Sequence, residues 1–146
     1  MDAIREVSES RRLDGVRVLI VDDDEGIRTT VRMVLEQSGA IVRDAASAEE
    51  ALTVLRQVRP DVLLSDLTMP RYDGYWLIRQ VRQLPAESGG ATPAAAVTGH
   101  AAPEDRVRVL RAGFQEHLPK PALTEGLIGM VTSLATRAAG MGGAGP

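Results

Sequence analysis

The chain has 146 residues, of which 44% are hydrophobic and 25% are charged, and its formal net charge is −3. This composition is typical of one soluble globular domain with a buried hydrophobic core, and it gives no whole-chain reason to expect nucleic acid or a membrane as a partner. The sequence has no cysteine, which excludes disulfides, thiol catalysis and thiolate metal sites. No segment has the pattern of a signal peptide or a membrane span, so we expect a cytoplasmic protein.

Two tails flank the region that carries regular patterns. Residues 1–14 are polar and lack a sustained period, so we expect a tail or a short helix there. Residues 139–146 are rich in glycine and cannot form a core, so we expect them to be disordered. The single folded domain is therefore expected at residues 15–138.

Apolar runs and amphipathic segments alternate through this domain in chain order. Strands are predicted at residues 16–21, 40–45, 61–65, 93–98 and 114–118. Helices are predicted at residues 25–38, from 47 to just before 60, at 73–83, from 103 to 113 and at 122–137. Asp24 and Glu25 are expected to begin the first helix, where negative charge is favoured. Ser47 with Glu50 has the pattern of a capping box for the second.

Five strands alternating with five helices predict βαβ units and a parallel sheet covered on both faces. For a chain this short we favour the α/β, flavodoxin-like, three-layer (βα)5 sandwich with strand order 2-1-3-4-5 over the six-stranded dinucleotide-binding order. Ligands of such sheets bind at the carboxyl ends of the strands, near the switch in strand order. The functional site is therefore expected at that edge.

Polar residues follow the strands at this edge. Asp22 and Asp23 end the first strand, Asp66 the third and Thr98 the fourth, and Lys120 comes just after the fifth. Three carboxylates close together repel one another, which a divalent cation would resolve. Ligands that are all oxygen indicate Mg²⁺, or otherwise Mn²⁺ or Ca²⁺. Together with a lysine and a hydroxyl, this set suits phosphoryl transfer to an aspartate.

At these residues the chain resembles the CheY-like receiver domain of bacterial two-component response regulators. The matching segments are VLIVDD at 18–23, DVLLSDLTMPRYDG at 61–74, AVTG at 96–99 and LPKP at 118–121. The style of the sequence is similar to receivers that are fused to hybrid histidine kinases. Only the Gly-rich tail follows, so we expect no output domain in this chain.

The resemblance implies a role for each matching residue. Asp66 would accept a phosphoryl group from a histidine kinase or a phosphotransfer protein, in a reaction that needs Mg²⁺ or Mn²⁺. Asp22, Asp23, Asp66 and the backbone carbonyl of Thr68 would hold the metal ion. Lys120 would pair with Asp66 and then with the phosphoryl group.

The resemblance also implies a switch. Thr98 would turn to hydrogen-bond a phosphoryl oxygen, and His117, at a position where the family often has Tyr or Phe, would rotate inward. The face formed by the helix at 103–113, the strand at 114–118 and the helix at 122–137 would then change shape for an unknown downstream protein to read. The same face is a candidate surface for a weak homodimer.

Three other functions share part of this pattern. A pseudo-receiver would fold alike without being phosphorylated, and the intact set of site residues argues against it. A phosphatase of the haloacid dehalogenase type would carry a second aspartate where this chain has Thr68. A flavin or dinucleotide binder would need a Gly-rich phosphate loop after the first strand, which this sequence lacks. We expect a phosphoacceptor that assists its own phosphorylation and dephosphorylation, not an enzyme.

Overall fold

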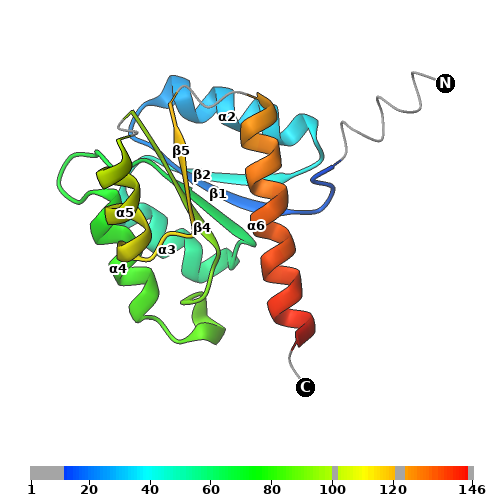
Figure 1. Cartoon of the computed structure of the whole chain (residues 1–146). Coiled ribbons are helices and arrows are strands. Elements are labelled where there is room, and N and C mark those ends of the chain that lie inside the picture. The colour runs from blue at the N-terminus through cyan, green and yellow to red at the C-terminus, as the bar shows by residue number, and fades with distance from the viewer. Residues whose placement is uncertain (1–11, 100–101, 121–123, 145–146) are drawn as a thin grey trace.

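Five strands form one parallel sheet at the centre of the molecule (Figure 1). The computed structural model describes residues 12–99, 102–120 and 124–144, with side chains as far as residue 137. The strands are β1 (Arg17–Val21), β2 (Ile41–Ala45), β3 (Val62–Ser65), β4 (Ala94–Thr98) and β5 (Glu116–Pro119). Their order is β2-β1-β3-β4-β5, and every neighbouring pair is parallel, which confirms the predicted topology.

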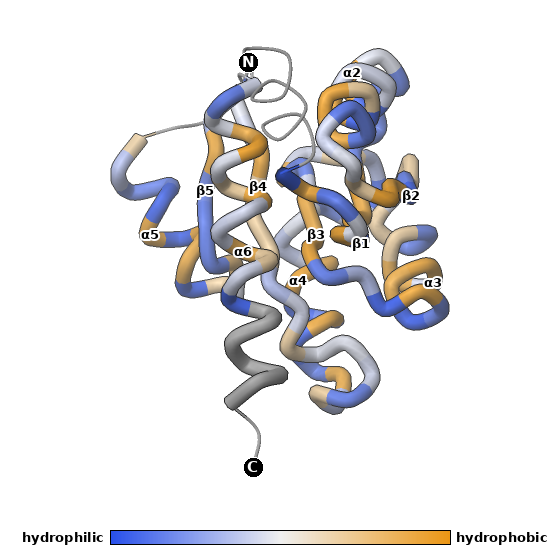
Figure 2. The backbone as a smooth tube through the Cα atoms, turned by 90° about the vertical axis from the view of Figure 1, so that its right-hand side faces the viewer, coloured by the Kyte–Doolittle hydropathy of each residue, from blue (hydrophilic) through white to orange (hydrophobic). Residues whose placement is uncertain are grey.

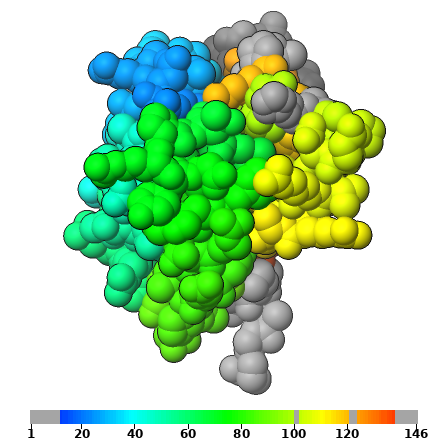
Figure 3. Space-filling model, turned by 90° about the vertical axis from the view of Figure 1, so that its left-hand side faces the viewer, coloured from blue at the N-terminus to red at the C-terminus, as the bar shows by residue number. Residues whose placement is uncertain are grey.

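Helices cover both faces of this sheet, which confirms the three-layer architecture. They are α2 (Glu25–Gln37), α3 (Ala48–Val58), α4 (Gly74–Gln83), α5 (Pro103–Ala112) and α6 (Thr124–Ala144), with a short 3-10 helix η1 (Ala86–Ser88). Helices α2 and α6 pack their buried residues against one face of the sheet. Helices α3, α4 and α5 pack theirs against the other face. Figure 3 shows the second of these faces, with α4 and the loop before it in green beside α5 in yellow. Among the described residues, no helix combines the length and apolar character needed to cross a membrane.

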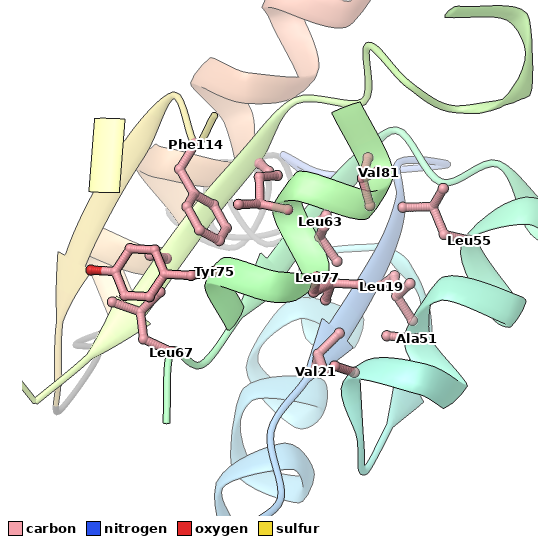
Figure 4. Packing of buried hydrophobic residues seen from close by; sticks show 14 of the residues in the cluster. Leu19, Val21, Ala51, Leu55, Leu63, Leu67, Tyr75, Leu77, Val81 and Phe114 are labelled. Atoms are coloured by element: carbon pink, nitrogen blue, oxygen red, sulfur yellow. The ribbon is translucent and has the colours of Figure 1, made fainter. Parts of the chain in front are cut away.

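Alternation along the strands divides the core into two layers. In β1, Leu19 and Val21 pack toward α3 and α4, while Val18 and Ile20 pack toward α2 and α6. Figure 4 shows the first layer, where side chains from β1 and β3 meet those of α3 and α4. Figure 2 shows that β3 is hydrophobic whereas β5 is largely hydrophilic. This difference fits their places, because β3 lies inside the sheet and β5 at its edge.

The end of the predicted N-terminal tail belongs to the core, which corrects the expected boundary. Leu13 is fully buried in the layer under α2 and α6, and its N–H donates to the carbonyl of Ser38 at 2.8 Å. One apolar residue in a polar segment gives no periodic signal, so its burial depends on a tertiary contact that the sequence pattern does not reveal.

The fifth strand begins two residues later than predicted, at Glu116 in place of Phe114. Gly113 ends α5 with a positive φ of 126°, and its N–H donates to Leu110. Phe114 then donates back to the carbonyl of Val109, so it completes the end of the helix before the strand can start. Its side chain is buried in the core, and this is the apolar signal that suggested a strand.

The last helix is longer than predicted. The α6 backbone continues to Ala144, past the expected end at 137 and into the segment 139–146 that was expected to be disordered. Adding residues to an existing helix costs far less than starting one, and the alanines and the methionine of 138–144 offset part of the cost of its three glycines. The predicted start of this helix at 122 lies outside the described residues, as do 145 and 146.

Candidate functional site

Three carboxylates meet at the carboxyl ends of β1 and β3. The two strands pair with Val21 opposite Ser65, so the residues that follow them, Asp22 and Asp66, come side by side. The N–H of Asp66 donates to the carbonyl of Val21 at 2.8 Å, which extends this pairing. Oxygen atoms of Asp22, Asp23 and Asp66 all lie within 4.8 Å of one another. Asp22 and Asp66 are buried and Asp23 is exposed, so the cluster opens to solvent on one side.

Lys120 reaches this cluster from the far end of the chain. Its ammonium lies 3.0 Å from an oxygen of Asp22 and 3.4 Å from one of Asp66. Its backbone N–H donates to the carbonyl of Thr98 at 2.7 Å, which fixes the residue beside the end of β4. The predicted pairing with Asp66 is therefore present, but the shorter contact is with Asp22.

The electrostatics of the cluster are unbalanced. Burial raises the pKa of Asp66, and the neighbouring Asp22 carboxylate raises it further, while Lys120 and the Thr68 N–H act in the opposite direction. Burial alone would lower the pKa of Lys120, but its contacts with Asp22 and Asp66 outweigh that effect and raise the pKa. Lys120 thus pairs with two of three clustered carboxylates, and an additional positive charge would be favourable there.

The donor set fits a hard divalent cation. Each of the three aspartates offers an oxygen atom, and Mg²⁺ binds carboxylate oxygens together with water. The N–H of Thr68 donates to an oxygen of Asp66 at 3.4 Å, which keeps this loop near the cluster. Metal binding through the Thr68 carbonyl stays a prediction.

Asp24 caps a helix, as expected, and is not part of the cluster formed by Asp22, Asp23 and Asp66. It is the N-cap of α2, and its side chain accepts the N–H of Ile27 at 3.0 Å. Its own N–H donates to an oxygen of Asp22 at 2.9 Å. Glu25 is the first residue of the helix. Asp24 therefore holds Asp22 in place from the start of α2.

Arg28 is a residue of this region that the sequence reasoning missed. Its guanidinium donates to the backbone carbonyl of Asp22 at 2.8 Å and to the Asp44 carboxylate at 3.3 Å. The available signal was an arginine four residues after the N-cap of a helix that begins at the site. Only the packing of α2 against β2 shows that its side chain turns back toward the strand end.

Gly74 allows the loop after Asp66 to fold tightly. Its N–H donates to the carbonyl of Leu67 at 2.9 Å. A Cβ at this position would collide with the carbonyl oxygen of Asp66 and would lie 2.9 Å from the Cα of Leu67. Asp73 caps α4 by accepting the N–H of Trp76 at 2.8 Å. The start of α4 is thereby pressed against the backbone that carries Asp66.

The two predicted switch residues lie on one face of the sheet. Ala96 packs toward α4 and α5, and strand alternation puts Thr98, two residues on, on the same side. His117 pairs with Ala96 in the neighbouring strand, and Leu118 packs toward the opposite face. Thr98 and His117 are both buried. Their placement is compatible with the switch, which stays a prediction.

A groove of about 490 Å³ runs between the β3–α4 loop and α5, and its lining includes Thr68 and Asp105. The guanidinium of Arg108 lies 4.3 Å above the ring of Tyr75, which ties α5 to the start of α4. The contact between Arg108 and Tyr75 therefore links α5 to α4, which follows the loop after Asp66.

Comparison with known proteins gives the family. The family model of the response regulator receiver domain matches residues 18–132. A protein of Leptolyngbya boryana named "Uncharacterized 14.6 kDa protein in sodA1 3'region" is 47% identical over 104 residues, which are 71% of this chain and 78% of that protein. The response regulator MprA of Mycolicibacterium vanbaalenii is 36% identical over 130 residues, which are 89% of this chain.

The match covers 54% of that MprA, so the chain spans about half the length of this relative. Among solved structures, a response regulator receiver domain protein (CheY-like) from Methanospirillum hungatei superposes with a TM-score of 0.78 and 27% identity. The superposition covers 88% of this chain and 99% of that one. The fold, the site and these matches agree, and the chain belongs to the response regulator receiver domains of two-component systems.

Proposed function

We propose that this receiver accepts a phosphoryl group on Asp66 from a phosphohistidine of a histidine kinase or a phosphotransfer protein. The observation that carries the proposal is the setting of the Asp66 carboxylate. It lies within 4.8 Å of oxygens of Asp22 and Asp23 and 3.4 Å from the ammonium of Lys120. An aspartate between metal-binding carboxylates and a lysine is equipped to be a nucleophile toward phosphorus.

The ionised Asp66 carboxylate attacks the phosphorus atom of the phosphohistidine. An oxygen–phosphorus bond forms as the nitrogen–phosphorus bond breaks, and the histidine nitrogen keeps the electron pair of that bond. Asp22, Asp23, Asp66 and the Thr68 carbonyl would hold Mg²⁺ or Mn²⁺, which supplies positive charge for the phosphoryl oxygens. Lys120, 3.4 Å from Asp66, would bind one of those oxygens once Asp66 carries the acyl phosphate.

The new phosphoryl group then changes what Thr98 and His117 contact. It brings acceptor oxygens and up to two negative charges to the end of β3, and Thr98 at the end of β4 donates to one of them. His117 lies on the same face of the sheet and moves inward as Thr98 leaves its place. A downstream protein, or a second copy of this chain, reads the altered face of α5, β5 and α6.

This chemistry makes the chain a phosphoacceptor, not a multiple-turnover enzyme. Each chain takes one phosphoryl group and later loses it to water with help from the same residues. We expect this cycle in the cytoplasm. A phosphorylation-independent interaction module would have the same fold and the same cluster, so the experiment must observe the covalent step itself.

Intact mass spectrometry observes that step. The wild-type chain incubated with Mg²⁺ and a small acyl phosphate should gain one phosphoryl adduct, and chelation of the metal should prevent it. Asp66→Asn should give no adduct. Asp61→Asn is the matched control. Asp61 lies just before β3, at the end of the strand opposite to Asp66, where it accepts the N–H of Arg17 at 2.9 Å.

Different outcomes point to different functions. A wild-type chain without an adduct would support the pseudo-receiver. Release of phosphate from many phosphoesters without any adduct would support a phosphatase. An adduct that persists in Asp66→Asn would contradict the assignment of the nucleophile.

A further inference from the structure

Arg28 contacts the backbone of the acidic cluster, at the carbonyl of Asp22. One nitrogen of its guanidinium donates to the carbonyl oxygen of Asp22 at 2.8 Å. Another donates to the carboxylate of Asp44, on β2, at 3.3 Å. The Arg28 side chain is 15% exposed and that of Asp44 is 33% exposed. A long side chain is thus fixed between a strand and the turn that carries Asp22 and Asp23.

We propose that Arg28 is a positioning residue for the divalent cation site, which rests on the proposed function. The carbonyl that it binds belongs to the peptide unit joining Asp22 to Asp23. Fixing a peptide plane fixes the backbone on both of its sides, so this contact sets how the two carboxylates stand relative to each other. The N–H of Asp22 is held on the other side by the carbonyl of Ala45 at 3.2 Å.

Such a constraint matters for Mg²⁺ in particular. This ion demands near-ideal octahedral geometry at short distances, so carboxylates that wander cost affinity. Residues that hold metal ligands in place commonly change metal affinity by about 10- to 100-fold when they are replaced. Arg28 has that kind of contact with the residue pair that supplies two of the three carboxylates.

A purely electrostatic role for Arg28 would have the opposite sign. A guanidinium near an acidic cluster repels an incoming cation, so its removal would strengthen Mg²⁺ binding. A positioning role predicts that its removal weakens Mg²⁺ binding. The direction of the change therefore separates the two explanations.

Arg32 provides a matched control. It lies one turn further along α2 and also pairs with Asp44, at 3.1 Å. It also pairs with Glu36 at 3.0 Å, and its backbone acceptor is the carbonyl of Val42 on β2, at 2.7 Å, whereas Arg28 binds the carbonyl of Asp22. Replacing Arg32 removes the same charge and the pair with Asp44, together with the pair with Glu36, but leaves the Asp22–Asp23 peptide held by Arg28.

Calorimetric titration with MgCl₂ alone tests the inference without any phosphodonor. We expect Arg28→Met to weaken binding about tenfold and Arg32→Met to stay close to the wild type. Arg28→Lys keeps the charge but lacks the fork that holds two acceptors at once, so it should weaken binding by a smaller factor. Urea unfolding of each variant establishes that it is folded during the titration.

Two results would overturn the inference while the proposed function stands. One is Arg28→Met binding Mg²⁺ as tightly as the wild type or more tightly. The other, decisive if Arg28→Met does not fold, is Arg28→Lys binding with wild-type affinity. A wild-type chain that binds no Mg²⁺ would overturn the metal site of the proposed function, and this inference with it.

Discussion

The two ends of the parallel sheet accommodate buried charge in opposite ways. At the carboxyl end, three carboxylates cluster, two of them beside the ammonium of Lys120, and burial and repulsion raise the pKa of Asp66. At the amino ends of β4 and β5, the half-buried guanidinium of Arg82 is surrounded by neutral oxygen atoms. It donates to the carbonyls of Gly113 and Gly90 at 2.9 Å, of Thr92 at 2.7 Å, and to the side chain of Gln115 at 3.1 Å.

Arg82 shows how this fold satisfies a charge that has only a structural purpose. Burial lowers the pKa of Arg82, but an arginine keeps its charge at neutral pH and its donors are matched by dipoles. The guanidinium ties the end of α4 to the segments that lead into β4 and β5. The carboxyl end lacks such a match, and asparagines there would remove the repulsion. An unrelieved charge at one site of a well-satisfied fold is typical of function.

The largest expected effect on stability comes from removing the hydrogen bonds of Arg82 at the amino ends of β4 and β5. Arg82→Met leaves three backbone carbonyls without this donor, and we expect the free energy of unfolding to fall by about 3 kcal/mol. Mg²⁺ affinity should not change, because the acidic cluster lies at the other end of the sheet. Urea unfolding measures the loss, with Arg79→Met on the exposed side of the same helix as control. Equal losses in the two variants would contradict the structural role of Arg82.

A smaller loss of stability is expected when the carboxyl end of the sheet loses the ammonium of Lys120. Lys120→Met leaves Asp22 and Asp66 facing each other, and without divalent ions at pH 7 the free energy of unfolding should fall by about 2 kcal/mol. Because contact with the two acids raises the pKa of Lys120, its contribution is present at neutral pH and is lost as the pH rises through that raised value. Added Mg²⁺ should restore more stability to this variant than to the wild type.

Urea unfolding without Mg²⁺ measures the loss of stability in Lys120→Met, and urea unfolding with Mg²⁺ measures how much stability the ion restores. Lys120→Met would contradict the electrostatic description if it were as stable as the wild type in the absence of metal.

The smallest expected effect is a gain in stability when Asp66 is replaced by asparagine. The pKa of Asp66 lies above its ordinary value of 3.8, so the folded chain binds its proton more tightly than the unfolded chain does. Stability from this group therefore falls as the pH rises from 3.8 through the raised value, and the ionised form is unfavourable at pH 7. Asp66→Asn should raise the free energy of unfolding at pH 7 by about 1 kcal/mol.

This gain should shrink as the pH is lowered through the raised pKa, and it should vanish below 3.8, where the carboxyl group becomes protonated in both states. Urea unfolding across the pH range, with Asp61→Asn as control, measures the difference. An Asp66→Asn chain that is less stable than the wild type at pH 7 would show that the contact with Lys120 outweighs burial and repulsion.

The sequence predicted those features of the fold and the site that depend on order along the chain. Strand alternation and the parallel topology bring together Lys120 and Asp22, which are 98 residues apart. They cannot say which acid the ammonium approaches more closely, because that depends on side-chain placement. Asp24 as a helix cap was predictable because a cap acts within one helical turn.

The features that were missed depend on tertiary packing. Leu13 is an isolated apolar residue, and Phe114 joins the end of a helix although its neighbours suggest a strand. Arg28 and Arg82 look like ordinary charged residues of amphipathic helices until their acceptors on other elements are known. Glycine in the last segment indicated disorder, whereas α6 was already formed and could extend into it.

The dependence of stability on Mg²⁺ is the most direct test of the claim that the carboxyl end carries unrelieved charge for a cation. Urea unfolding of the wild-type chain at pH 7 should show the free energy of unfolding rising with Mg²⁺ concentration, since only the folded chain has the site. Asp23→Asn, which removes the exposed carboxylate of the cluster, should show a much smaller rise, and Arg82→Met should show the full one. A wild-type free energy of unfolding that does not respond to Mg²⁺, or an Asp23→Asn chain that responds equally, would contradict it.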